Sequence, residues 1–262
     1  MVATPRNPRT APEPEGADAY PYGWRYVECV LADGSVRLDQ IPLTLEDVLH
    51  PQEGDQVTHS DVHQRICIYL FNVFSGLVAA LPGAVVLHDV RVAWDVPGLK
   101  PHGPDLAVIL GVRERKNWST FDVAQEGVRP VLLVEVTSPE TRSIDLTSKL
   151  EEYYLAGVPL YIIVDLVQRE GRTVPRLLGY RQTDTVYAVL APDERGRLWL
   201  EPLKVWLGVQ DQHVVCYDEA SMPIGDYTDL KTTLATELEA RAAAERRLQE
   251  VEAELRQLRG EV

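Results

Sequence analysis

The sequence predicts a mixed α/β (α+β) fold in which helices flank a mixed sheet, followed by a C-terminal coiled-coil helix. Between residues 84 and 165, strand-length apolar runs and a helical segment follow in the order strand, strand, helix, strand, which is typical of a helix-covered sheet. Residues 175–217 add shorter alternating runs, and residues 230–262 lack proline and are rich in Ala, Glu and Arg. We therefore expect one domain over 23–225 and a separate helical tail over 230–262.

The N-terminal residues 1–22 predict no folded element. They contain several prolines and no apolar run, so we expect a disordered lead-in rather than a signal peptide. The body begins with two alternating segments within residues 24–41, joined by Asp33-Gly34, a dipeptide typical of hairpin turns. We expect this hairpin at one edge of the sheet.

Two helices are predicted next. Residues 43–49 form a short helix capped by Thr44, and residues 61–81 form a longer one. The longer helix is expected to pack against the sheet through apolar side chains on one face: Ile66, Leu70, Val73, Phe74, Leu77 and Leu81.

The sheet itself is predicted from residue 84 onward. The expected elements are strands over 84–90, 91–95, 105–110 and 130–136, a helix from about 143 to 155, and a strand over 160–166. Residues 131–165 can form a crossover that joins two parallel strands. The runs within 175–217 are expected to extend the same sheet as antiparallel strands, with turns at 193–196 and near Gly208.

The tail has heptad spacing at its C-terminal end, through Leu248, Val251, Leu255, Leu258 and Val262. In the middle of the tail the apolar pattern is weak, because the charged residues Arg241 and Glu237 occupy the heptad positions that a coiled coil buries. Two interpretations stay open: a solvated helix held by ion pairs, or an oligomerising coiled coil. We favour self-association or partner association, because an isolated amphipathic helix gains little stability alone.

The charge and cysteine content restrict the function. A formal net charge of −14 excludes a broad basic surface, so any nucleic-acid contact has to be local. Cys29, Cys67 and Cys216 are widely spaced, which favours packing roles, a reducing cytoplasm and no structural zinc site. No apolar run is long enough to span a membrane.

Three polar residues stand out against their surroundings. Asp105 and Glu135 lie beside or within apolar strands, and Lys149 lies on the following helix. Two carboxylates from neighbouring strands can hold Mg²⁺ or Mn²⁺, and a nearby lysine can stabilise negative charge. Simpler roles stay open: Asp105 could satisfy a turn, Glu135 could face solvent, and Lys149 could pair with Asp145 on the helix surface.

In combination these residues make the chain similar to the Uma2 family (DUF820) of restriction-endonuclease-like proteins, within the PD-(D/E)xK nuclease superfamily. The matching residues are Pro104-Asp105, Glu135 to Pro139, Asp145, Lys149, Tyr153, Gly157 to Pro159 and Asp165. The strong match covers 104–165, and a weaker one covers about 41–215.

This resemblance implies a restriction-endonuclease-like core that hydrolyses DNA phosphodiester bonds. Asp105, Glu135 and the carbonyl of Val136 would bind Mg²⁺ (or Mn²⁺), and Lys149 would be the catalytic lysine. The chain departs from the Glu-x-Lys pattern of the superfamily, because Thr137 stands where that lysine would be. The lysine has moved to the following helix in Uma2-like proteins, and Lys149 fits this change.

Other residues are candidates for supporting roles. Tyr153 and Asp145 share a helix face with Lys149, while Glu53 and His63 could contribute from upstream, although a capping or surface role is favoured for His63. The loop containing Arg113, Arg115 and Lys116 could contact phosphates, or could simply be solvated. The alternative to a DNA endonuclease is a catalytically silent nuclease fold that acts as a binding or assembly module through its coiled-coil tail.

Overall fold

The structure is a computed structural model. It describes residues 19–20, 22–31, 33–49, 52–137, 142 and 146–259. Most of the predicted lead-in and the candidate Asp145 therefore lie outside the described residues. The chain divides into two compact units, Met1–Gln64 and Arg65–Val262. The predicted domain boundaries at 23 and 225 stay predictions.

The first unit contains a small antiparallel sheet in the order β2-β1-β3. Its elements are β1 (Gly23–Val30), β2 (Val36–Pro42), α1 (Leu45–Leu49) and β3 (Gln56–Val57). The hairpin turns at Asp33-Gly34, where Gly34 has a φ of 82° and the Asp33 carboxylate accepts a bond from the backbone of Ser35. Its expected place at an edge of the central sheet is wrong, because β1 pairs with β3 instead.

The long helix α2 (Asp61–Val78) begins in the first unit and continues into the second. The hydroxyl of Ser60 caps it by accepting a hydrogen bond from the backbone N–H of His63 at 3.2 Å. Ile66, Leu70, Val73 and Phe74 are buried as predicted. The predicted end was wrong, since the helix stops at Val78 and Leu81 is exposed in the turn that follows.

The second unit is built on a six-stranded mixed sheet in the order β11-β10-β9-β8-β6-β4. Its strands are β4 (Val85–His88), β6 (Leu106–Ile109), β8 (Pro130–Thr137), β9 (Leu160–Arg169), β10 (Arg172–Gln182) and β11 (Tyr187–Val189). β8 and β9 are parallel and are joined through α5 (Ser148–Leu155), as the predicted crossover requires. The described part of this helix begins later than residue 143, because Leu146 and Thr147 form a turn.

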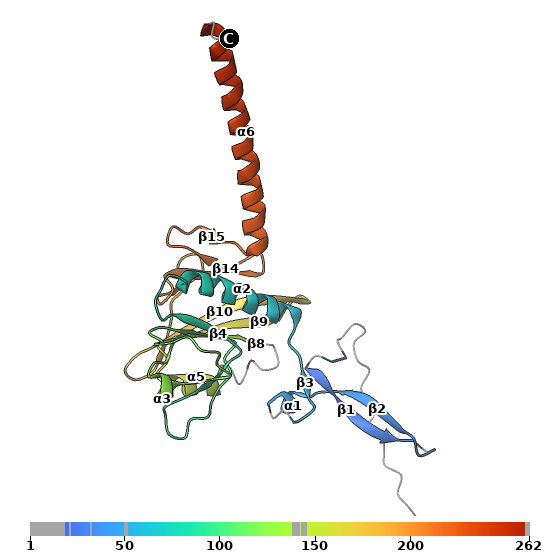
Figure 1. The fold of residues 1–262 in the computed structure, drawn as a ribbon. Coiled ribbons are helices and arrows are strands. Elements are labelled where there is room, and N and C mark those ends of the chain that lie inside the picture. Colours follow the sequence, from blue (N-terminus) through green and yellow to red (C-terminus); the bar gives the residue numbers. More distant parts are fainter. Residues whose placement is uncertain are drawn as a thin grey trace, which may run out of the picture. The chain divides into compact units, whose positions relative to one another are not determined.

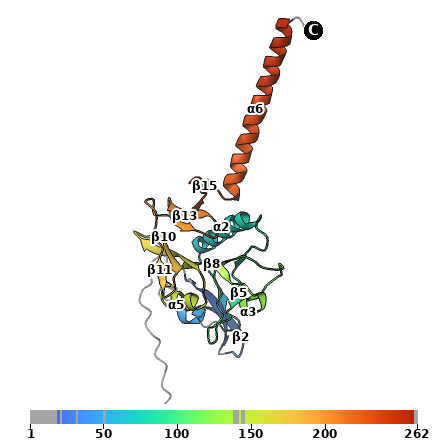
Figure 2. The ribbon, with the colours of Figure 1, turned by 90° about the vertical axis from the view of Figure 1, so that its left-hand side faces the viewer.

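Helices cover both faces of this sheet. In Figures 1 and 2, α2 lies over one face and α5 over the other, with β8 and β9 between them. Burial on both faces explains why the apolar runs of β8 and β9 are almost continuous rather than alternating. The core on the α5 side includes Leu133, Tyr153, Tyr161 and Ile163.

A second, two-stranded sheet lies beside this core. β5 (Arg91–Ala93) pairs in parallel with β7 (Thr120–Asp122). The prediction that residues 91–95 form a strand of the central sheet is therefore wrong. The short helix α3 (Val123–Glu126) follows directly, and the Asp122 carboxylate caps it by accepting a bond from the backbone N–H of Gln125. The side chains of Phe121 and Val123 are buried in the hydrophobic core and attach this segment to it.

The C-terminal strands form a sheet of their own, in the order β12-β13-β14-β15. They are β12 (Leu198–Leu200), β13 (Val205–Gln210), β14 (His213–Tyr217) and β15 (Pro223–Ile224). The prediction that they extend the central sheet is wrong. The predicted turn near Gly208 is also wrong, since Gly208 lies within β13, where a Cβ atom would stand 2.9 Å from Cγ of Arg197. This glycine permits close packing rather than a turn.

One side chain ties this small sheet to α2. The phenol of Tyr69 donates a hydrogen bond to the carbonyl of Ile224 at 2.7 Å and accepts one from the backbone N–H of Cys216 at 2.9 Å. Burial raises the pKa of this phenol.

The chain ends in one continuous helix, α6 (Tyr227–Arg259), drawn in red in Figure 1. Large apolar side chains are exposed along it: Leu230, Leu234, Leu238, Leu248, Val251 and Leu255. Ion pairs one turn apart, such as Arg241 with Glu245 at 3.0 Å, also line it. None of the helices formed by the described residues combines the length and the apolar character that a membrane crossing requires.

Candidate active site

The structure brings Asp105 and Glu135 to neighbouring strands of the central sheet. Asp105 directly precedes β6, whose first residue Leu106 stands opposite Val134 of β8. The Asp105 carboxylate accepts a hydrogen bond from the backbone N–H of Val136 at 2.7 Å. This bond fixes the carboxylate against the strand that carries Glu135.

Glu135 is a buried carboxylate that two side chains of α5 approach. Its side chain is only 5% exposed, so its charge needs compensation within the protein. Nζ of Lys149 lies 3.1 Å from Oε1, and the phenol of Tyr153 donates to the same oxygen at 2.6 Å. The spacing of Lys149 and Tyr153, four residues apart on one helix, places both side chains over the strand.

A cysteine that the sequence analysis treated only as a packing residue borders these carboxylates. Sγ of Cys67, on α2, lies within 4.8 Å of a carboxylate oxygen of Asp105. Burial raises the pKa of the Cys67 thiol, and the negative charges of Asp105, Glu135 and Asp89 raise it further. The protonated thiol is therefore favoured over the thiolate beside these carboxylates.

Behind Tyr153, a partly buried chain of polar side chains contacts α5. Nε1 of Trp94 donates to Nδ1 of His102 at 2.7 Å, and Nε2 of His102 lies 2.6 Å from Oε2 of Glu152. Because indole N–H is only a donor, Nδ1 must be the acceptor, and the ring proton on Nε2 is directed at Glu152. The His102 ring also contacts the Tyr153 ring edge-on, with centroids 5.0 Å apart. Nothing in the sequence pattern had linked these residues to the site.

The remaining predicted site residues are distributed differently. Glu53 is exposed and His63 is buried, and both belong to the first unit. The His63 ring stacks on that of His59, with centroids 4.5 Å apart. Asp145 lies outside the described residues, so the surface pair with Lys149 that the sequence left open has no structural description.

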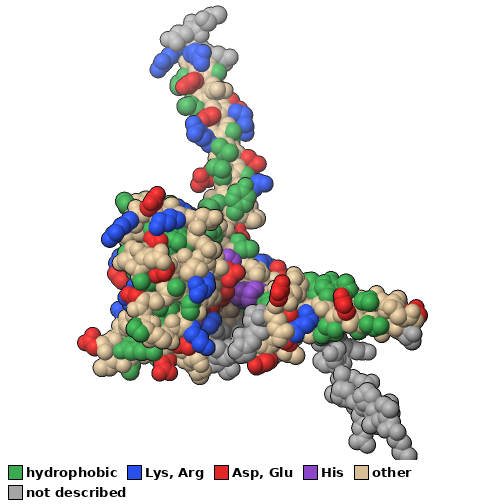
Figure 3. All heavy atoms as spheres, turned by 60° about the horizontal axis from the view of Figure 1, so that its bottom comes forward, with side chains coloured by type: hydrophobic (Ala, Val, Ile, Leu, Met, Phe, Trp, Pro, Cys, Tyr) green, Lys and Arg blue, Asp and Glu red, His purple; other side chains and the backbone are tan. Residues whose placement is uncertain are grey.

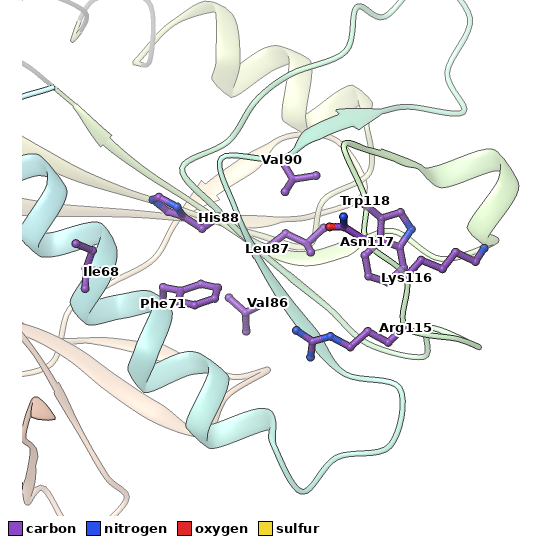
Figure 4. Close-up of a pocket in the computed structure, with 10 residues that line it drawn as sticks. All are labelled: Ile68, Phe71, Val86, Leu87, His88, Val90, Arg115, Lys116, Asn117 and Trp118. Carbon is purple, nitrogen blue, oxygen red and sulfur yellow. The ribbon is translucent and has the colours of Figure 1, made fainter. Parts of the chain in front are cut away.

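The basic loop, for which phosphate contact and simple solvation were both left open, lines a pocket of about 380 Å³. Figure 4 shows this pocket, with Phe71 and Val86 on one side and Arg115, Lys116 and Trp118 on the other. Arg113 is also exposed on this loop. Nζ of Lys116 and Nε1 of Trp118 both bind Oε1 of Glu126, which holds the loop in position.

Asp165 is a second buried carboxylate, to which the sequence pattern assigned no site role. It was expected at the end of a strand, but β9 continues to Arg169 and Asp165 is completely buried. Arg142 and Arg176 both pair with it. The signal was present in the sequence, because Asp165 interrupts an apolar run just as Glu135 does.

Surface charge is mixed on the face shown in Figure 3. Lys and Arg side chains there are interspersed with Asp and Glu, with no broad basic area. This mixed charge agrees with the net charge of −14, and on this face it leaves only local groups of cations for nucleic-acid contact.

Comparison with known proteins gives one family. The sequence profile of Uma2, described as "Putative restriction endonuclease", matches residues 54–210. Among solved structures, the chain is similar to a protein from Anabaena variabilis ATCC 29413 described as a putative nuclease belonging to DUF820. The two are 17% identical with a TM-score of 0.38, over 59% of this chain and 86% of that one. No curated protein matches the chain.

Proposed function

Because the chain belongs to the Uma2 family, we propose that it is a nuclease, and more narrowly a metal-dependent endonuclease that hydrolyses DNA phosphodiester bonds. The observation that supports this most is the convergence of Lys149 and Tyr153 on Oε1 of Glu135. A buried carboxylate beside a second carboxylate, with one lysine in reach, is an arrangement that phosphodiester hydrolysis can use.

The donor atoms in this part of the sheet fit a hard divalent cation. Asp105 and Glu135 offer carboxylate oxygens, and the carbonyl of Val136 is directed to the same strand edge as its N–H, which binds Asp105. These three residues would hold Mg²⁺ or Mn²⁺. When bound, such a cation lowers the pKa of a coordinated water and offsets negative charge on the phosphate.

The protein's own groups have separate roles in this proposal. Lys149 is 25% exposed, so its ammonium group can contact both Glu135 and a phosphate oxygen, whose developing charge it stabilises. Tyr153 holds Glu135 in one orientation from the buried side. Asp105 is fixed by the backbone of Val136 and needs no rearrangement before the reaction.

The exposed basic loop is the proposed place of DNA contact beside this site. His88 and Asp89 connect the pocket to Asp105, since the backbone N–H of Asp89 bonds to the Asp105 carbonyl at 3.2 Å. Arg113, Arg115 and Lys116 would bind phosphates there, and Trp118 adds an aromatic wall.

Cleavage assays with matched lysine variants test this function. We expect the wild type to cleave single-stranded, double-stranded or branched DNA with Mg²⁺ or Mn²⁺, and Glu135→Ala and Lys149→Ala to lose that cleavage. Lys204→Ala, at a surface lysine paired with Glu201, is the control and should retain it. No cleavage by the wild type, or undiminished cleavage by both site variants, would exclude the enzyme.

A second candidate function is assembly through α6. The apolar side chains that α6 exposes support it, because they gain stability only when another surface covers them. This function does not require hydrolysis, and a protein that assembles through α6 but never cleaves DNA would match it.

A further inference from the structure

Asp165 lies at the centre of a second charged cluster in the central sheet. Its carboxylate is 0% exposed and accepts a hydrogen bond from the hydroxyl of Thr137 at 3.2 Å. Nε of Arg142 lies 2.8 and 3.0 Å from its two oxygens. Nε and Nη2 of Arg176 approach Oδ2 at 3.1 and 2.5 Å.

This cluster carries more positive charge than the buried carboxylate requires. One guanidinium group neutralises Asp165, and the second leaves a local charge of +1 in a chain of net charge −14. The side chains of Arg142 and Arg176 are 40% and 45% exposed, although Asp165 is not exposed at all. Each guanidinium has five N–H donors, and the described bonds to Asp165 use Nε of Arg142 and Nε and Nη2 of Arg176. Among the described residues, the other donors can therefore bind a ligand on the outer side.

The strand register places this cluster on the same face as Glu135. In the pairing of β8 with β9, Glu135 stands opposite Ile163 and Thr137 stands opposite Asp165. In the pairing of β9 with β10, Asp165 stands opposite Arg176. Side chains two residues apart on a strand share a face and are about 6.6 Å apart, so the cluster adjoins the candidate active site.

We propose that Arg142 and Arg176 form a phosphate-binding site for the nucleic-acid strand, next to the phosphate held at Glu135. This inference rests on the proposed function. Two planar guanidinium groups anchored on one carboxylate suit bidentate binding of phosphate oxygens. Asp165 is a positioning residue, which fixes both groups before the nucleic acid arrives.

The test measures DNA binding without cleavage, with Ca²⁺ in place of Mg²⁺. The affinity of a fluorescent oligonucleotide is determined by anisotropy at several salt concentrations for wild type, Arg142→Gln and Arg176→Gln. We expect each variant to bind about tenfold more weakly and to lower the slope of log affinity against log salt by about 0.7 to 0.9. Arg176→Lys keeps the charge, so it should retain the slope while it loses affinity.

Arg181→Gln is the matched control. Arg181 is an exposed arginine of the same strand, but its odd spacing from Arg176 places it on the opposite face of β10. Its affinity and salt slope should equal those of the wild type. Urea unfolding of each variant establishes that it is folded, since either single variant leaves Asp165 with one arginine.

The possible outcomes test the phosphate-binding site independently of nuclease activity. Salt slopes that fall in Arg142→Gln and Arg176→Gln, but not in Arg181→Gln, support the site even if the wild type never cleaves DNA. Unchanged slopes in both variants overturn it even if cleavage with Mg²⁺ is normal. A wild type that does not bind DNA also overturns it.

Discussion

Nζ of Lys149 lies 3.1 Å from Oε1 of Glu135, although Glu135 belongs to the strand β8 and Lys149 to the helix α5. Lys149→Met should therefore lower metal-dependent cleavage by about 100-fold or more, because the ammonium charge is lost where phosphate charge develops. It should also lower the free energy of unfolding by about 1 to 3 kcal/mol, since a buried carboxylate loses its cation. Single-turnover cleavage and urea unfolding measure the two effects, and a fully active Lys149→Met enzyme would contradict the first.

Tyr153→Phe removes one hydroxyl and leaves the ring contacts in place. The lost bond is 2.6 Å long and ends on a buried charge, so we expect the free energy of unfolding to fall by about 1.5 to 3 kcal/mol. The neighbouring Tyr154→Phe is the control, because its hydroxyl bonds to the carbonyl of Asp184 in an exposed region. Urea unfolding should show a clearly larger loss for Tyr153→Phe, and equal losses would argue against a special role of this bond.

His102→Phe tests the polar chain behind α5. It keeps an aromatic ring against Tyr153 but breaks the bonds to Trp94 and Glu152, so we expect unfolding to become easier by about 1 to 3 kcal/mol. Glu152→Gln retains an oxygen that accepts the Nε2 proton and should be milder. Chemical unfolding of both variants is the measurement. If Glu152→Gln lowered the free energy of unfolding as much as His102→Phe, the charge of Glu152 rather than the hydrogen-bond geometry would stabilise α5.

Alkaline pH should destabilise the protein through Cys216. Burial raises the pKa of this thiol from 9.0 to about 12. In the unfolded chain the thiol ionises near pH 9, so the folded state holds an extra proton above that pH. The stabilisation is complete below pH 9 and is lost as the pH rises toward 12, by up to about 1.4 kcal/mol per pH unit. Urea unfolding between pH 8 and 10.5 should show this slope.

Cys216→Ala is the matching variant for that slope. It should unfold more easily at every pH, because it leaves a cavity, but its stability should fall less steeply above pH 9. The slope should not vanish, since the pKa of the buried Cys67 thiol is raised as well. An identical slope in wild type and variant would show that Cys216 does not contribute.

Removal of residues 230–262 tests the association proposed for α6. The truncated protein should have a lower molar mass per particle in light scattering, because it loses the exposed leucines of that helix. The unfolding of the remaining chain should change little. An unchanged oligomeric state would remove the association.

The central crossover was predictable from local sequence. Apolar runs on both sides of a helix predict parallel strands, and β8, α5 and β9 form them. Asp105, Glu135 and Lys149 stood out as charged residues near apolar runs, but each had a simpler explanation, and the resemblance to the Uma2 family was needed to join them into one candidate site. The structure then shows Lys149 in contact with Glu135.

Sheet membership was not predictable in the same way. The segments of β5 and β13 have ordinary strand patterns, but pairing depends on which edge is free in three dimensions. The second charged cluster was missed for a related reason, because Arg176 meets Asp165 only through the antiparallel register of β9 and β10. The pattern of one segment contains no information on its partner in another.

The two hydrogen bonds of Tyr69 join the helix α2 to the strands β14 and β15 of the small C-terminal sheet. Local unfolding of that sheet is therefore coupled to α2. Local unfolding of β14 and β15 would have to break both bonds to the partly buried phenol on α2. The backbone amide of Cys216 should therefore exchange its hydrogen with water no faster than the amides in the middle of α2. A single hydroxyl thus makes the small sheet part of the same cooperative folding unit as the helix over the central sheet.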